Sequence, residues 1–94
     1  MDFGQALIAL KIGSRVARSG WNGKGMWLAL TPGTQSLSAD KFWSPQNKAF
    51  ASSRPERSAD VLPCITMKTA DDKILMGWLA SQSDMLADDW EIVP

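Results

Sequence analysis

Residues 14–30 read Ser-Arg-Val-Ala-Arg-Ser-Gly-Trp-Asn-Gly-Lys-Gly-Met-Trp-Leu-Ala-Leu, and they carry the clearest structural pattern of the chain. It predicts two strands, residues 14–18 and 26–30, joined by a turn that holds three glycines and an Asn-Gly pair. Apolar residues alternate along the second strand, and alternate side chains point to the same face of a sheet. The stretch therefore predicts an antiparallel hairpin with one apolar face.

A short helix is predicted before this hairpin. Asp2 can cap it, with Gln5 in the capping-box position, and Gly13 can end it in the left-handed conformation. Between these limits, apolar residues recur at helical spacing and give the helix one apolar face. They are Phe3, Ala6, Leu7 and Leu10.

The middle of the chain, residues 34–60, is the least patterned part. Thr31-Pro32-Gly33 ends the second strand before it. Ser44-Pro45 predicts the start of a brief helix that reaches about residue 51, because proline is favoured at the first helical position. Three aromatic residues would give this helix something to bury: Phe42, Trp43 and Phe50. Residues 52–60 are predicted to form an exposed loop.

The last third of the chain predicts a second hairpin. Two apolar, strand-length runs, residues 62–69 and 74–79, flank a polar turn at 70–73. A helical turn around residues 85–87, capped by Ser83, and a final strand at 90–93 would follow. We expect an α+β fold, with an antiparallel sheet of about five strands and the N-terminal helix packed on it. Residues 1–94 would form a single domain with a less regular insertion at 34–60.

The composition favours binding over catalysis. The 94 residues include five tryptophans, no histidine, no tyrosine and one cysteine. Histidine is the usual acid or base near neutral pH, and a serine triad needs one. Cys64 alone cannot form a disulfide or a thiolate metal site. We therefore expect no catalytic residue, no metal site and no cofactor.

Charge and hydrophobicity limit the partners. Ten basic and ten acidic residues balance, which argues against binding a nucleic-acid polymer. No segment resembles a membrane span or a secretory signal, and a single unpaired cysteine fits a reducing cytoplasm. Five tryptophans and five methionines are more apolar surface than so small a core readily hides. This surplus predicts a homo-oligomer.

The glycine-rich turn contains the first candidate site. Gly23 and Lys24 lack the remaining spacing of a phosphate-binding P-loop. Trp21 has two interpretations: it folds back as a lid on the core, or it is an exposed platform for stacking, with Asn22 supplying amide groups beside it. Trp43, in the irregular region, also fits either role.

Ser81-Gln82-Ser83-Asp84 is the second candidate site. Two hydroxyls, an amide and a carboxylate provide the donors and acceptors that hydroxyl-rich ligands need. Spacing alone favours the alternative, in which Ser83 caps a helix and the other side chains are solvated. Asp71-Asp72 is predicted to lie in the hairpin turn, and Asp88-Asp89 in a solvated turn before Trp90. Arg15 and Arg18 are predicted to pair with acidic neighbours, with a pyrophosphate as the alternative partner.

Four segments, in this order, resemble a known family. They are residues 3–7, 20–26, 67–71 and the long run 78–90, Trp-Leu-Ala-Ser-Gln-Ser-Asp-Met-Leu-Ala-Asp-Asp-Trp. The chain resembles the Thoeris anti-defence 2 family of small phage and prophage proteins over nearly its whole length apart from residues 34–60. The C-terminal run is the specific part of the resemblance.

The resemblance implies a protein that sequesters an immune messenger in the cytoplasm of the infected bacterium. The messenger is a cyclic ADP-ribose isomer that a TIR-domain enzyme makes from NAD, and some family members also take up cyclic oligonucleotides. The family implies a homotetramer with ligand pockets between protomers and no degradation of the ligand. The longer segment at residues 40–60 departs from shorter family members, and such a segment could line or cover the pocket.

Combining both sources, we expect the turn and the polar loop to converge on one pocket between protomers. Nine residues are the expected ligand contacts: Trp21, Asn22, Gly23, Lys24, Trp43, Ser81, Gln82, Ser83 and Asp84. Trp21 would stack on a base or ribose, and Asp84 would accept from a ribose diol. Two other classes stay open: a nucleotide-modifying enzyme that uses carboxylates, and a structural or protein-binding phage component.

Overall fold

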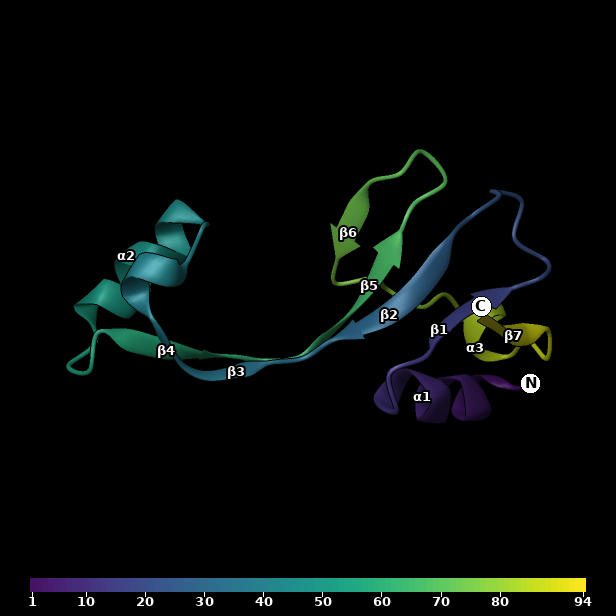
Figure 1. The fold of residues 1–94 in the computed structure, drawn as a ribbon, viewed down its shortest axis with the longest axis horizontal. Helices are drawn as coiled ribbons and strands as arrows, with labels where there is room; N and C mark the ends of the chain where they lie inside the picture. Colours follow the sequence, from purple (N-terminus) through teal and green to yellow (C-terminus); the bar gives the residue numbers. More distant parts are fainter. The chain divides into compact units, whose positions relative to one another are not determined.

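The computed structural model describes all 94 residues and divides the chain into two compact units (Figure 1). The first unit comprises Met1–Thr31 and Cys64–Pro94, and the second comprises Pro32–Pro63. The first unit contains α1 (Phe3–Lys11), β1 (Arg15–Arg18), β2 (Trp27–Thr31), β5 (Cys64–Lys68), β6 (Ile74–Met76), α3 (Gln82–Met85) and β7 (Trp90–Val93). The second contains β3 (Thr34–Ser38), the 3₁₀ turn η1 (Ala39–Lys41), α2 (Pro45–Ser53) and β4 (Ser58–Val61).

Helix α1 forms as the capping pattern predicts. The Asp2 carboxylate accepts from the Gln5 backbone N–H at 2.8 Å, and the Gln5 side chain accepts from the Asp2 N–H at 2.9 Å. This capping box satisfies backbone donors that the first helical turn leaves unpaired. Gly13, with φ of +96°, follows the last turn in the left-handed region. The predicted start and end of the helix are confirmed.

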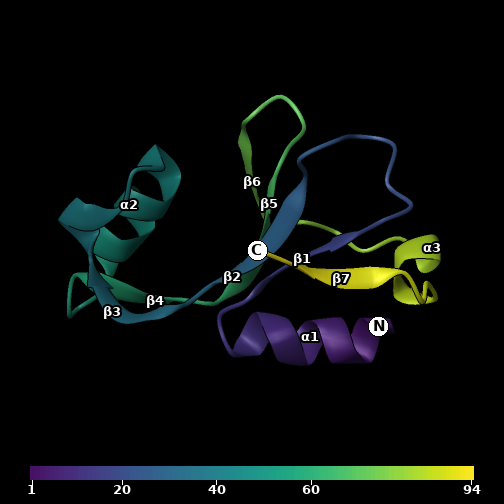
Figure 2. The same ribbon diagram turned by 45° about the vertical axis from the view of Figure 1, so that its right-hand side comes forward.

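Five antiparallel strands form the sheet of the first unit, in the order β6-β5-β2-β1-β7. Val16 of β1 pairs with Leu28 of β2 on one side and with Ile92 of β7 on the other. Helix α1 contacts β1, β2 and β7, along one side of the sheet in Figure 2. The predicted α+β fold and both predicted hairpins are confirmed.

The core of the first unit lies between α1 and the sheet. Its largest buried side chains are Trp90, Leu10, Leu28 and Val16, and Trp90 is only 2% exposed. The Phe3 ring packs 5.4 Å from the Trp90 ring. Burial of each large apolar side chain stabilises a fold by about 1.5–3 kcal/mol. The final strand is therefore anchored by its first residue.

The second unit is a two-stranded antiparallel ribbon with one helix. β3 pairs with β4, and the register shifts between Thr34 and Leu37, where Ser36 has a φ of +52°. Helix α2 begins at Pro45 as predicted, although the Ser44 side chain makes no capping hydrogen bond. Three residues of this unit are buried: Ala39, Ala51 and Ser58.

Two predictions for the middle of the chain are wrong. The predicted loop at residues 52–60 instead holds the end of α2 and the start of β4. Two of the three aromatic residues expected to bury against the helix do not: Trp43 is 85% exposed and Phe50 is 58% exposed, whereas Phe42 is half-buried. Both strands of the ribbon are largely exposed, so their sequences carry no alternation of apolar and polar residues that would reveal them.

The last helix begins earlier than predicted. Ser81, and not Ser83, is its cap: the Ser81 hydroxyl accepts from the Asp84 N–H at 3.1 Å, and the Asp84 carboxylate accepts from the Ser81 N–H at 3.3 Å. The three-residue spacing of these two side chains is that of a capping box. It places the single turn at Gln82–Met85. None of the three α-helices combines the length and the apolar character that a membrane-spanning helix needs.

Candidate functional site

The loop between β1 and β2 forms one wall of a surface hollow of about 400 Å³ in the first unit. Four of the nine expected ligand contacts line it together: Trp21, Asn22, Gly23 and Lys24. The rest of the lining includes residues of β1 and β7: Ala17, Arg18, Glu91 and Val93. We call this hollow the loop cavity. It presents an indole, an amide and an ammonium group to one concave surface.

Trp21 packs on the core, as the first of its two interpretations predicts, and it also lines the loop cavity. Its ring meets the Trp90 ring at 5.5 Å and 80°, and the Trp78 ring at 6.4 Å and 63°. These edge-to-face contacts, with Trp78 and Trp90 also 6.2 Å apart, are the arrangement that aromatic quadrupoles favour. Trp21 is thus half-buried against the core, while its remaining surface lines the loop cavity.

Asp84 joins the two predicted segments directly. One carboxylate oxygen, Oδ1, accepts from Trp21 Nε1 at 3.2 Å and from Arg18 Nη1 at 2.8 Å. The other oxygen, Oδ2, accepts from the Ser81 N–H. A carboxylate offers about four acceptor sites. Three of those of Asp84 are already used within the protein. Asp84 fixes the Trp21 indole, and its capacity to accept from a ligand diol is small.

The other residues of the polar loop divide into two kinds. Ser81 uses its hydroxyl to cap α3. Gln82 and Ser83 are exposed on that turn. None of the residues from Ser81 to Asp84 lines the loop cavity. Within one protomer, the two predicted segments therefore meet through the contact between Trp21 and Asp84 and share no cavity lining.

Asp89 is not the solvated turn residue that the sequence predicted. Its Oδ1 accepts from Arg18 Nε at 2.8 Å, and its Oδ2 accepts from the Gly20 N–H at 2.7 Å. The predicted pairing of Arg18 with acidic residues is confirmed, and its two partners are Asp84 and Asp89. A Cβ atom at position 20 would lie 2.6 Å from Asp89 Oδ2, so only glycine allows this approach.

The electrostatics of this group keep both carboxylates ionised. Burial by itself would raise the pKa of Asp84, but hydrogen bonds from Arg18, Trp21 and Ser81 outweigh it and hold that pKa below its usual value. The pKa of Asp89 is lowered chiefly by the hydrogen bond from Arg18, and the Gly20 N–H adds to this effect. The pKa of Arg18 is raised by Asp89 and Asp84.

Sequence reasoning did not assign Arg18, Gly20 or Asp89 to the site. Arg18 is opposite Trp90 in the register of β1 and β7, which brings Asp89 beside it although the two residues are 71 positions apart. That register depends on the tertiary pairing of the two strands. The one available signal was the pair of acidic residues just before Trp90, which sequence reasoning assigned to a turn.

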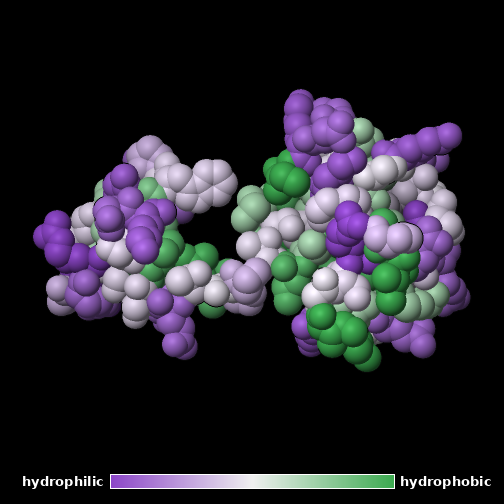
Figure 3. Space-filling model, viewed as in Figure 1, coloured by the Kyte–Doolittle hydropathy of each residue, from purple (hydrophilic) through white to green (hydrophobic).

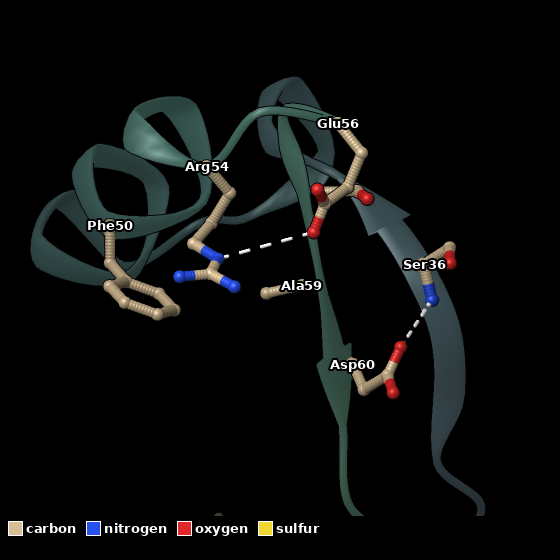
Figure 4. A pocket seen from close by; sticks show the side chains of 7 residues that line it. Ser36, Phe50, Arg54, Glu56, Ala59 and Asp60 are labelled. Atoms are coloured by element: carbon tan, nitrogen blue, oxygen red, sulfur yellow. Dashed lines mark hydrogen bonds and ion pairs between the residues drawn. The ribbon is translucent and has the colours of Figure 1, made fainter.

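Trp43, the remaining expected contact, belongs to the second unit. That unit has cavities of its own, none of them lined by Trp43. In one of about 390 Å³, the Arg54 guanidinium lies 5.8 Å from the centre of the Phe50 ring (Figure 4). The Asp60 carboxylate there accepts from the Ser36 N–H at 2.8 Å. No expected ligand contact lines this cavity. The loop cavity is therefore the candidate site.

Two comparisons with known proteins cover nearly the whole chain. The model of the Thoeris anti-defense 2-like domain matches residues 1–93. The chain is also 44% identical over 93 residues to the protein named Thoeris anti-defense 2 from Bacillus phage SP01. That alignment covers 99% of this chain and 94% of the phage protein. The match includes the 32–63 unit as well as the first unit.

Proposed function

This chain belongs to the Thoeris anti-defense 2-like family, and from that premise we propose that it binds an immune messenger and withholds it without degrading it. Membership implies a function against Thoeris defence. The proposed ligand is a cyclic ADP-ribose isomer made by a TIR-domain enzyme, with cyclic oligonucleotides as a second class. The finding that supports this most is the grouping of Trp21, Asn22 and Lys24 around one cavity.

The chemistry of the loop cavity suits such a ligand. A half-buried indole offers a face to a base or ribose, and base stacking contributes about 1–3 kcal/mol. Asn22 and Lys24 are exposed at the rim, where an amide can pair with a base edge and an ammonium group can neutralise a phosphate. Trp43 is proposed as a further stacking surface because its ring is free. Gln82 and Ser83 are the proposed hydroxyl contacts of the polar turn.

Sequestration fits the acid–base properties of the site better than turnover does. A general base works best when its pKa lies near the working pH. The two carboxylates that hold the Gly20–Trp21 segment of the loop, Asp84 and Asp89, have lowered pKa values and accept hydrogen bonds from Arg18. They are therefore weak bases that are already engaged. This reasoning favours a binding protein over an enzyme that uses these carboxylates.

A homo-oligomer, with the tetramer as the expected form, is part of the proposal. Many large apolar side chains are exposed, and Figure 3 shows several on the visible face of the first unit. Those of the first unit include Ile8, Ile12, Ile74, Leu79, Leu86 and Ile92. Apolar surface on this scale is typical of proteins that associate. Light scattering should show a tetramer at micromolar concentration, and a monomer would contradict the proposal.

One experiment separates the three functional classes. The protein is mixed with a cyclic ADP-ribose isomer, removed with its bound ligand, and denatured, and the released ligand is analysed by chromatography. Intact ligand supports sequestration. A chemically altered ligand would establish an enzyme, and no depletion of the ligand would support a structural or protein-binding role.

Two variants extend that experiment: Trp21→Ala tests the stacking surface, and Trp21→Phe is its matched control. Phenylalanine keeps much of the packing on Trp78 and Trp90 but removes the Nε1 donor to Asp84. Trp21→Ala should weaken binding about tenfold or more, the loss expected for one stacked base. Trp21→Phe should lose less. If Trp21→Ala also unfolds the protein, Trp21→Phe still reports on the stacking surface.

A further inference from the structure

Arg18 lies at the centre of a network that joins three separate segments. Its guanidinium contacts Asp84 of α3 through Nη1 and Asp89 through Nε, both at 2.8 Å. The side chains are largely withdrawn from solvent: Arg18 is 18% exposed, Asp84 14% and Asp89 30%. Charge-assisted hydrogen bonds in such an environment are stronger than those on an open surface. The group is therefore an internal ion-pair network.

Each carboxylate of this network also holds the loop that lines the cavity. The Asp84 oxygen that accepts from Arg18 accepts from Trp21 Nε1 as well. The second oxygen of Asp89 accepts from the backbone N–H of Gly20, the residue before Trp21. The loop is thus held at two adjacent points, once through its backbone and once through its indole.

Only an arginine can serve both carboxylates in this way. Two nitrogens of one rigid, planar group point to two different partners, whereas a lysine offers a single ammonium group. Without the guanidinium, both carboxylates would lose the one cation that pairs with them. The other charged groups near the cavity, Lys24 and Glu91, line it but make no ion pair with Arg18.

We infer that Arg18 is a positioning residue, which acts through Asp84 and Asp89 to hold Gly20 and Trp21 in the orientation that forms the wall of the loop cavity. Its effect on ligand affinity rests on the proposed function, but its effect on the loop does not. Removal of the guanidinium should release the Trp21 indole while leaving the sheet in place.

The test observes the indole directly. The five tryptophan Nε1–H signals are recorded by proton–nitrogen NMR, and Trp21→Phe identifies the Trp21 signal by its loss. Arg18→Gln should shift or broaden the Trp21 signal and leave that of Trp43, in the second unit, unchanged. Arg18→Lys should give the same change, because lysine cannot reach both carboxylates. Arg15→Gln, at the other end of β1 with its guanidinium on Trp27, is the matched control and should not move the Trp21 signal.

Binding gives the second readout. Affinity for a cyclic ADP-ribose isomer should fall about tenfold in Arg18→Gln, the loss expected when charge-assisted hydrogen bonds no longer hold the site. Arg15→Gln should bind as the unaltered protein does. If the unaltered protein binds no isomer, the proposed function fails while the NMR result still decides the role of Arg18.

A Trp21 signal that stays in place in Arg18→Gln, or full affinity in Arg18→Lys, would overturn the inference. If Arg18→Gln does not fold, Asp84→Asn and Asp89→Asn replace it, since asparagine keeps the size of each side chain and one acceptor oxygen. Asp84→Asn should then move the Trp21 signal, and an unmoved signal in both variants would overturn the inference in the same way.

Discussion

The two units of this protein are stabilised in different ways. The first buries Trp90, Leu10, Leu28 and Val16 between a helix and a five-stranded sheet. The second buries only Ala39, Ala51 and Ser58, and its largest side chain, Trp43, is exposed. It is held by the ladder between β3 and β4 and by local turns. A packed apolar core thus supports the candidate site in the first unit, whereas the second unit has no such core.

This difference also sets how stability is expected to respond to mutation. Apolar burial supplies most of the free energy of folding, and large effects come from cavities, unpaired buried groups and disrupted networks. These features are concentrated in the first unit. Substitutions of similar size should therefore have unequal effects in the two units.

The largest effect is expected for Trp90→Ala. This substitution empties the centre of the core and removes the Nε1 hydrogen bond to the Asp84 carbonyl at 2.9 Å. It should lower the free energy of unfolding by about 3–5 kcal/mol, measured by urea denaturation. Trp43→Ala removes the same atoms from an exposed site and should change the free energy of unfolding by less than about 0.5 kcal/mol. Equal losses would contradict the comparison.

A smaller loss is expected for Gly20→Ala. The new Cβ would lie 2.6 Å from Asp89 Oδ2, so the carboxylate must move and lose its bonds to Gly20 and Arg18. Overpacking of this kind costs about 1–3 kcal/mol. The control is Gly4→Ala in α1, where the nearest atom is 3.3 Å away and alanine favours the helix. Thermal unfolding should show a lower melting temperature for Gly20→Ala and an unchanged one for Gly4→Ala. Equal melting temperatures in the two variants would argue against a tightly held loop.

Acid should destabilise the first unit through Asp84 and Asp89. Their pKa values are lowered in the folded state, so the unfolded chain binds more protons as the pH falls towards the ordinary aspartate value of 3.8. The stabilisation is present above that value and is lost as the pH falls through the folded pKa values. Urea denaturation should give a flat free energy of unfolding between about pH 5 and 8 and a decline below about pH 4. Asp89→Asn should reduce the decline, and an unchanged decline would point to other carboxylates.

The smallest effect is expected when the second unit is removed. Thr31, the last residue of β2, pairs with Cys64, the first residue of β5. An Asn-Gly turn can therefore join these two residues in place of residues 32–63. The shortened chain should keep the sheet of the first unit and unfold at the same or a higher urea concentration, because a shorter loop costs less entropy to close. A flexible Gly-Ser segment of the original length is the control. A collapsed chain without fixed tryptophan signals would show that the first unit depends on the second.

The same difference explains what could be predicted from the sequence. In the first unit, burial imposes periodicity and caps mark the helix, so α1, β1, β2, β5 and β7 follow from local pattern. In the second unit, Thr34–Ser38 and Ser58–Val61 form strands that are mostly exposed, and exposure leaves no such pattern. The sequence therefore showed a brief helix there but neither strand.

The loop of the candidate site was predictable from the sequence, but the hydrogen bonds that hold the loop in place were not. Glycines and an Asn-Gly pair placed Trp21 in a surface turn, and the structure confirms a turn that borders a cavity. The bond between Trp21 and Asp84 and the two bonds of Arg18 join residues that are 63 to 71 positions apart. They depend on the pairing of β1 with β7, which no local motif specifies.

The proposal that the protein withholds its ligand without converting it is tested most directly by titration. A fixed amount of a cyclic ADP-ribose isomer is mixed with increasing amounts of protein, and the free messenger is read from the activity of its effector after a short and a long incubation. Sequestration predicts inhibition that saturates at a fixed ratio of ligand to sites and is the same at both times. Continued loss of messenger at substoichiometric protein would contradict it and establish turnover.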